Sequence, residues 1–261
     1  MAYSKNAANS EHPSRTIVKL VRSCTETGVW PKVMLLCGKE DFLVDWAKVF
    51  IKDSILSAPS AALDCVSFSE GPFDVYEIIA ACETVPLLSQ RKLVIVDGAD
   101  IFSAQSPKDL SSTEVSVLAE YIPKLPESTL LLFTCGKPNK TRGLYKAVAK
   151  YGIVYDFVPL DDATLSGWMA KRLKAAGLAA APADLISFAR ACGYGDPERG
   201  YTLHNLENDL KKAIAAADKT VLSFDDLMES AAPQAELNAF RLLDSAFSGR
   251  KNGAFSILNA T

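Results

Sequence analysis

The segment with the clearest potential for chemistry is Cys37-Gly-Lys-Glu-Asp-Phe42, which follows the apolar run Val33–Cys37. A nucleotide-binding α/β protein places its phosphate loop at such a point, because backbone N–H groups and the dipole of the next helix attract anions. A P-loop needs two glycines around the turn, then Lys and Ser or Thr. Here one glycine precedes Lys39 and two carboxylates that would repel a triphosphate. We therefore expect no bound nucleotide, and we expect Asp41 to act as a cap or dipole partner of the following helix.

A second position for nucleotide chemistry is the end of the apolar run Val94-Ile-Val-Asp97. The next residue is Gly98, where an ATPase would carry a Glu that activates water, so Asp97 is predicted to be a turn residue. No Ser, Cys or His constellation replaces this chemistry, since His204 lies among polar residues on a predicted helix. We predict no catalytic residues and no cofactor. An active ATPase of the same fold remains an alternative.

The cysteines and histidines do not have the spacing of a metal site. None of the six cysteines forms a C-x-x-C pair, and the two histidines, His12 and His204, are far apart. Cysteines in apolar runs behave as small hydrophobic residues, so we predict structural thiols and no metal. No apolar run reaches the ~18 residues of a membrane span, and the N-terminus has no signal-peptide pattern. The sequence therefore predicts a cytoplasmic protein with reduced thiols and no membrane partner.

The charge balance limits nucleic-acid binding. The formal net charge is -3, whereas binding by phosphate neutralisation alone needs clustered Lys and Arg. Any contact with DNA is therefore expected to be local, or made within a complex. An aromatic-basic patch could be formed by Trp168, Lys171, Arg172 and Lys174, but Trp168 lies on the apolar stripe of its helix, which favours core packing with a solvated basic face.

The elements that must position these residues alternate between strand and helix up to Pro159. Short apolar runs predict strands, and 3.6-residue periodicity predicts helices between them. The predicted strands are 33–37, 64–68, 93–96, 129–133 and 154–158; the predicted helices are 16–24, 41–56, 75–82, 115–122 and 141–150. Strands that are apolar on both faces indicate the α/β class, with a parallel sheet covered by helices on both faces. We predict a disordered leader over 1–13 and an α/β domain over 14–159.

Beyond Pro159 the periodicity is helical only. Helices are predicted over 162–176, from Pro182 and over 202–217, and Ser223-Phe-Asp-Asp226 resembles a capping box that opens a fourth. This predicts a small helical domain over 160–231. Leu237, Phe240, Leu243 and Phe247 form a further apolar stripe, so we expect 232–261 to begin a truncated third helical domain.

A pair of leucines follows the predicted helix 75–82. Pro86 should interrupt that helix, and Leu87 and Leu88 come directly after it. Two adjacent apolar side chains in a connection cannot both easily face one core. Either they cover the core beneath the sheet, or they project as an anchor into a pocket of a partner, with Arg91 and Lys92 as a polar rim. The pattern leaves both possibilities open.

Several segments together resemble the delta subunit of bacterial DNA polymerase III, from about residue 31 onward. They are Val33–Leu43, Thr84-Val-Pro-Leu-Leu-Ser-Gln-Arg-Lys-Leu-Val-Ile-Val96, Leu144–Ala147 with Val154–Leu160, Trp168–Gly177, and Ala239–Asp244 through Gly249-Arg-Lys to Ile257-Leu258. The resemblance implies a degenerate AAA+ (P-loop-like) module, a helical lid domain and a helical collar. It also implies that Val85, Pro86, Leu87, Leu88 and Arg91 bind the sliding clamp.

The same resemblance implies a role in DNA replication. A delta-type subunit binds and opens the sliding clamp (beta) for loading on primed DNA, without hydrolysing ATP, in a pentamer with gamma/tau and delta-prime subunits. A scaffold-type subunit, like delta-prime, is a further alternative. The chain departs from the family in the extension before Ile17, in the turn-rich segment Gly193–Gly200, and at Leu88, where an aromatic residue is common.

Overall fold

The computed structural model describes residues 12–69, 73–103, 112–196 and 198–231. The chain divides into two compact units, Met1–Pro159 and Leu160–Thr261. The expected leader lies outside the described residues except for residues 12 and 13, and the expected third domain, 232–261, lies wholly outside them.

The first unit is built on a five-stranded sheet in the order β2-β3-β4-β1-β5, in which every pair of neighbours is parallel. The strands are β1 (Val33–Gly38), β2 (Cys65–Ser69), β3 (Lys92–Asp97), β4 (Thr129–Cys135) and β5 (Ile153–Phe157). The three central strands are almost entirely buried, as their continuous apolar runs predict. The predicted α/β class with a parallel sheet is confirmed.

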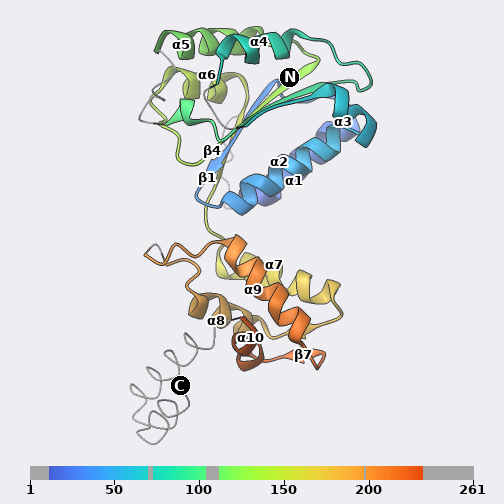
Figure 1. Cartoon of the computed structure of the whole chain (residues 1–261), viewed down its shortest axis with the longest axis vertical. Helices are drawn as coiled ribbons and strands as arrows, with labels where there is room; N and C mark the ends of the chain where they lie inside the picture. Colours follow the sequence, from blue (N-terminus) through green and yellow to red (C-terminus); the bar gives the residue numbers. More distant parts are fainter. Residues whose placement is uncertain (1–11, 70–72, 104–111, 197, 232–261) are drawn as a thin grey trace, which may run out of the picture. The chain divides into compact units, whose positions relative to one another are not determined.

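Helices cover both faces of this sheet (Figure 1). On one face lie α1 (Pro13–Thr27), α2 (Asp41–Ile55) and α3 (Ala58–Asp64); on the other lie α4 (Val75–Glu83), α5 (Ser112–Tyr121) and α6 (Gly143–Tyr151). Two short 3₁₀ turns, Asp100–Phe102 and Ile122–Lys124, join these elements to the strands. The arrangement buries each apolar strand face beneath an apolar helix stripe.

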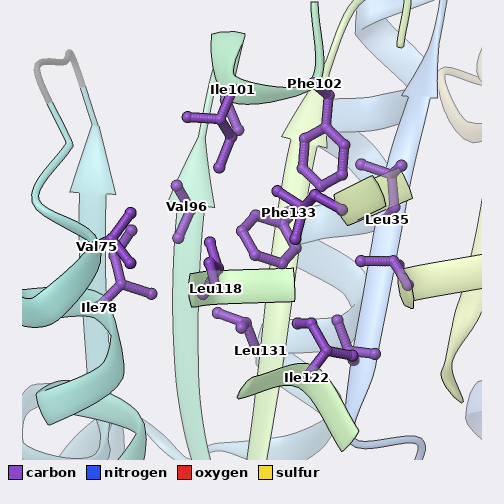
Figure 2. Packing of buried hydrophobic residues seen from close by; sticks show 14 of the residues in the cluster. Leu35, Val75, Ile78, Val96, Ile101, Phe102, Leu118, Ile122, Leu131 and Phe133 are labelled. Carbon is purple, nitrogen blue, oxygen red and sulfur yellow. The ribbon is translucent and has the colours of Figure 1, made fainter. Parts of the chain in front are cut away.

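The core beneath α4 and α5 makes the sheet a rigid support. Figure 2 shows Val96 and Phe133 of the strands facing Ile78 of α4 and Leu118 of α5. The rings of Phe102 and Phe133 meet edge to face, with centroids 5.1 Å apart. Each fully buried Leu, Ile or Phe contributes roughly 1.5–3 kcal/mol of transfer free energy, so the strand ends are firmly fixed.

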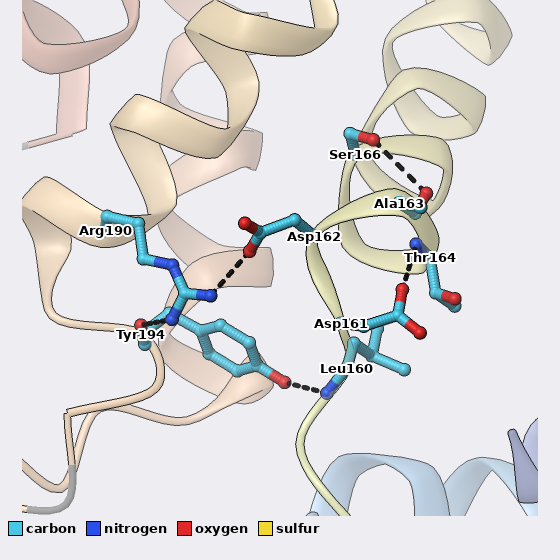
Figure 3. A network of polar contacts seen from close by, with 8 residues as sticks. All are labelled: Leu160, Asp161, Asp162, Ala163, Thr164, Ser166, Arg190 and Tyr194. Atoms are coloured by element: carbon cyan, nitrogen blue, oxygen red, sulfur yellow. Dashed lines mark hydrogen bonds and ion pairs between the residues drawn. The ribbon is translucent and has the colours of Figure 1, made fainter.

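The second unit consists of α7 (Asp162–Ala175), α8 (Pro182–Cys192), α9 (Leu203–Ala216) and α10 (Phe224–Ala231), with β6 (Ala179–Ala180) pairing parallel to β7 (Val221–Leu222). Polar contacts join the start of α7 to the end of α8 (Figure 3). The hydroxyl of Tyr194 accepts from the amide of Leu160 at 2.8 Å, and Arg190 pairs with Asp162 at 2.5 Å. The turn after α8 therefore supplies contacts that order the beginning of this unit.

Several local details differ from the sequence-based predictions. The first helix spans Pro13–Thr27 instead of 16–24, and the ring of His12 caps it. No helix was predicted between 56 and 64, yet α3 forms there, because Pro59 in its first turn needs no amide partner. The strand predicted to start at Asp64 starts at Cys65. One half of the expected Ser223–Asp226 capping box is present, since the Asp226 carboxylate accepts from the amide of Ser223; it accepts from the hydroxyl of Ser223 as well.

Candidate functional site, a leucine loop at the amino ends of two strands

The predicted anchor lies on the connection between α4 and β3, which we call the leucine loop (Thr84–Arg91). The side chains of Leu87 and Leu88 are 70% and 61% exposed, and Val85 is 70% exposed. The possibility that both leucines cover the core beneath the sheet is therefore wrong. The loop presents three neighbouring apolar residues to solvent, with Pro86 half-buried between them.

A buried carboxylate holds this loop. Asp64, the last residue of α3, is 0% exposed. Its Oδ1 accepts from the amide of Leu87 at 2.6 Å, and its Oδ2 accepts from the amides of Leu88 at 2.9 Å and Ser89 at 2.6 Å. The hydroxyl of Ser89 also donates to Oδ2 at 2.7 Å. We call this arrangement of Asp64 with the donors of residues 87–89 the aspartate cradle.

The ionisation of Asp64 matches this role. Burial alone would raise its pKa, but the donors of Leu87, Ser89 and Leu88 hold the pKa of the carboxyl well below its usual range. Hydrogen bonds to an ionised acceptor are stronger than those between neutral groups. The cradle therefore carries a negative charge near neutral pH.

The strand register brings Asp64 to the loop. β2 and β3 are neighbours, with Cys65 beside Leu93, so the residues just before the two strands lie next to each other. Asp64 and the leucine loop thus meet at the amino ends of β2 and β3. Asp64 is not among the site residues predicted from the sequence. The sequence does show a charged residue at the start of an apolar run, but this pattern does not indicate that its partner is the backbone of residues 87–89.

Both ends of the loop are also tied down. At its start, the hydroxyl of Thr84 donates to the carbonyl of Ala81 at 2.8 Å and accepts from the Lys92 ammonium. At its end, the Arg91 guanidinium donates to the carbonyls of Glu127 and Thr129. The structure thus places Arg91 against the chain entering β4, and places Lys92, only 7% exposed, against Thr84.

The opposite, carboxyl edge of the sheet contains the segment first considered for phosphate binding. The amides of Lys39 and Glu40 point at the carbonyl of Phe157, at 3.0 and 3.4 Å. Gly38 has a φ of 132°, and a Cβ there would lie 2.1 Å from the same carbonyl oxygen. Glu40, which is 4% exposed, is the N-cap residue of α2 and makes no side-chain capping bond; Asp41 is therefore not the cap, and it lies in the first turn, where its charge suits the helix dipole. The amides of Lys39 and Glu40, which would bind a phosphate in a P-loop, therefore donate to a carbonyl of the protein itself.

Asp97 lies at the neighbouring part of this edge, within a network of polar contacts. Its carboxylate pairs with the Lys48 ammonium at 2.6 Å and accepts from the hydroxyl of Thr134. Burial opposes ionisation, but Lys48 and Thr134 hold the pKa of Asp97 below its usual value. An open hollow of about 460 Å³ here is lined by the carboxylates Asp41, Asp45 and Asp97. Lys48 pairs with both Asp45 and Asp97, so these three carboxylates and one ammonium leave a net negative charge, which disfavours a polyphosphate. Asp97 therefore has a structural partner in addition to the predicted turn at Gly98.

Comparison with known families gives an independent result. Residues 34–157 match the family described as DNA polymerase III, delta subunit. Over these residues the chain is similar to delta subunits. A comparison with curated proteins finds no match.

Solved structures agree with this delta-like fold. The Bacillus subtilis clamp loader delta protein YqeN has a TM-score of 0.62 and 18% identity, over 94% of this chain and 70% of that chain. The Thermotoga maritima RuvB Holliday junction branch migration motor has a TM-score of 0.54 and 12% identity, over 87% of this chain and 71% of that chain. At these identities the likeness concerns the fold, which is AAA+-like.

Other candidate groups of the delta-like chain have structural partners. All six cysteines are free thiols, and a hydrogen bond with Cys135, together with burial, raises the pKa of Cys37. The Arg172 guanidinium lies 3.6 Å from the ring centroid of the half-buried Trp168 and also pairs with Glu207. Among the described residues, no group of His, Cys, Asp and Glu could hold a metal ion, and no helix could cross a membrane.

Proposed function

We propose that this chain is a clamp-loader delta subunit that binds the ring-shaped sliding clamp through the leucine loop and favours its open form. The observation that carries the proposal is an ordered loop with exposed Leu87 and Leu88 in a delta-like module. Adjacent apolar side chains on a fixed backbone suit insertion into a partner's pocket. In this role the chain is a cytoplasmic replication protein.

The size of the apolar anchor is adequate for binding. Burying two leucine side chains contributes roughly 3–6 kcal/mol before the costs of association. The bonds of the aspartate cradle reduce the ordering cost, because the loop backbone is already fixed in the free protein. In this proposal Val85 and Pro86 extend the apolar contact. Arg91 contributes by fixing the end of the loop against the carbonyls of Glu127 and Thr129.

Clamp opening needs no chemistry from this subunit. A protein that binds one clamp conformation more tightly shifts the ring toward that conformation. We propose that the delta subunit does this within a loader that contains gamma/tau and delta-prime subunits and acts at primed DNA. ATP hydrolysis then belongs to other subunits. The amides of Lys39 and Glu40 directed at Phe157, and the carboxylates beside Asp97, support this assignment.

The direct test is binding to the cognate sliding clamp, measured by surface plasmon resonance or calorimetry. We expect Leu87→Ala/Leu88→Ala to weaken binding more than about 100-fold, as for the loss of two hot-spot residues. Val49→Ala is the matched control, because Val49 is 53% exposed on α2, away from the loop. Circular dichroism should show all variants folded.

Three results would contradict the proposal. Absence of clamp binding by the unmodified chain would favour a scaffold-type subunit, and ATP hydrolysis by the pure protein would favour an active ATPase. Equal binding by the double variant and the unmodified chain would place the anchor elsewhere.

A further inference from the structure

We propose that Asp64 is the positioning residue of the partner-binding surface, holding Leu87 and Leu88 outward without contacting the partner itself. This inference rests on the proposed function and adds a residue to it. Asp64 is 0% exposed, whereas the two leucines that it positions are 70% and 61% exposed. Its effect on a partner must therefore pass through the loop backbone.

The bonding pattern shows what Asp64 fixes. Its two carboxylate oxygens accept from three consecutive backbone amides, those of Leu87, Leu88 and Ser89, and from the hydroxyl of Ser89. A backbone whose amides converge on one point has little freedom to rotate. The convergence directs the amides of 87–89 inward, and the side chains of both leucines extend into solvent. Without this acceptor, one leucine could turn back toward the protein, as expected for apolar residues in water.

The cradle also connects the loop to the sheet. Asp64 stands immediately before β2, and the loop stands immediately before the neighbouring strand β3. The hydroxyl oxygen of Ser89 lies 2.7 Å from both the carboxylate of Asp64 and the carbonyl of Arg91, so its one proton is shared between these two acceptors. Movement of the loop would therefore break bonds at the amino ends of the neighbouring strands β2 and β3. Because the loop is bonded to residues at the ends of these strands, the sheet restricts the movement of Leu87 and Leu88.

The helix that carries Asp64 gives no separate reason for a carboxylate at this position. Asp64 is the last residue of α3, where the helix dipole disfavours negative charge. A buried charge is also costly unless hydrogen bonds satisfy it. Both effects oppose Asp64, and the donors of the leucine loop offset both. The donors of the leucine loop therefore stabilise the buried charge of Asp64, and this charge in turn holds the loop in its conformation.

The test compares Asp64→Asn with the unmodified full chain in two measurements. The amide group of Asn keeps the shape but replaces one accepting oxygen with a donor, so at least one loop amide loses its partner. We expect hydrogen exchange at the amides of residues 87–89 to speed up at least about 10-fold, with exchange in β3 and β4 unchanged. We expect affinity for the sliding clamp to fall about 10-fold. Ser89→Ala, which removes one of the four bonds, should show the same changes at a smaller size.

Two controls separate positioning from a general loss of structure. Asp97→Asn removes a carboxylate at the other end of β3 and should change neither loop exchange nor clamp affinity. Combined with Leu87→Ala/Leu88→Ala, Asp64→Asn should weaken clamp binding no further, because there is no anchor left to position. A purely structural role would weaken binding in that background as well.

The outcomes are distinct for the two proposals. Unchanged exchange in Asp64→Asn, or exchange raised equally throughout the sheet, would overturn the positioning role. Faster loop exchange with unchanged clamp affinity would overturn it too. If the unmodified chain does not bind the clamp, the proposed function fails. Loop exchange then decides alone whether Asp64 orders the leucines.

Discussion

Strand β3 has a carboxylate beside each of its ends, and the two are used in opposite ways. At its amino end, Asp64 accepts from the backbone of a loop whose leucines remain exposed. At its carboxyl end, Asp97 accepts from Thr134 and pairs with Lys48, and the result is a closed network. Each carboxyl has a lowered pKa for the same physical reason, since donors outweigh burial. The charge of Asp64 therefore orders an exposed apolar loop, whereas the charge of Asp97 is paired within a polar network.

The difference shows where function can lie on this fold. Open parallel sheets usually bind ligands outside the carboxyl ends of their strands, where helix N-termini converge. In this delta-like chain the amides of that edge are directed at Phe157, and Glu40 is buried beside them. The amino ends of β2 and β3 carry the exposed apolar residues instead. The parallel sheet of this chain thus supports an exposed apolar loop at its amino edge.

The largest effect should come from disturbing the closed edge at Gly38. In Gly38→Ala the new Cβ would lie 2.1 Å from the carbonyl oxygen of Phe157, at a φ of 132° that disfavours any side chain. We expect the free energy of unfolding to fall by about 3–5 kcal/mol, measured by urea denaturation. The affinity of the folded fraction for the clamp should not change, because the leucine loop is at the other edge.

Gly136→Ala is the matched control for this substitution. Gly136 accepts from the amide of Gly38, but a Cβ at Gly136 would meet no atom within 4 Å. We expect its free energy of unfolding to stay within about 1 kcal/mol of the unmodified chain. Equal losses in both variants would mean that the edge is not closed by the approach of β5.

The two edges also differ in how far the sequence predicts them. At the carboxyl edge the sequence shows that the P-loop motif is missing, because the single glycine and the two carboxylates after Lys39 are local features. The bonds from the amides of Lys39 and Glu40 to Phe157 appear only in the structure. The apolar loop was readable only as two alternatives, since an adjacent leucine pair does not specify which way it points. The exposure of Leu87 and Leu88 in the structure decides between them.

The cradle could not be predicted from the sequence, for a physical reason. Asp64 and Leu87 are 23 positions apart and meet only because β2 and β3 pair in one particular register. Register follows from the packing of the whole sheet, which local patterns do not contain. Arg91 shows the same limit. Its charge suggested a polar rim, whereas its guanidinium bonds to carbonyls before and within β4.

The Asp97 network should give an intermediate effect. We expect Asp97→Asn to lower the free energy of unfolding by about 1–2 kcal/mol, because it weakens bonds to Lys48 and Thr134 that are partly shielded from water. A double-mutant cycle with Lys48→Met should show coupling between the two. Asp156→Asn is the control, since its pair with Lys140 is largely exposed and should contribute little. If Asp156→Asn lowered the free energy of unfolding more than Asp97→Asn, the partly shielded pair would not be the more stabilising of the two.

The smallest effect should appear in the pH dependence of the cradle. The carboxyl of Asp64 has an ordinary pKa of 3.8, and the donors of the leucine loop lower it in the folded protein. The contribution of this carboxylate to stability is therefore full above the ordinary pKa, and it decreases as the pH falls from there toward the lowered pKa. The difference in urea midpoint between the unmodified chain and Asp64→Asn should be constant from about pH 8 to 5 and should shrink below about pH 4. A difference that grew on acidification would mean that the donors of residues 87–89 do not favour the ionised form, and the cradle would lose its physical basis.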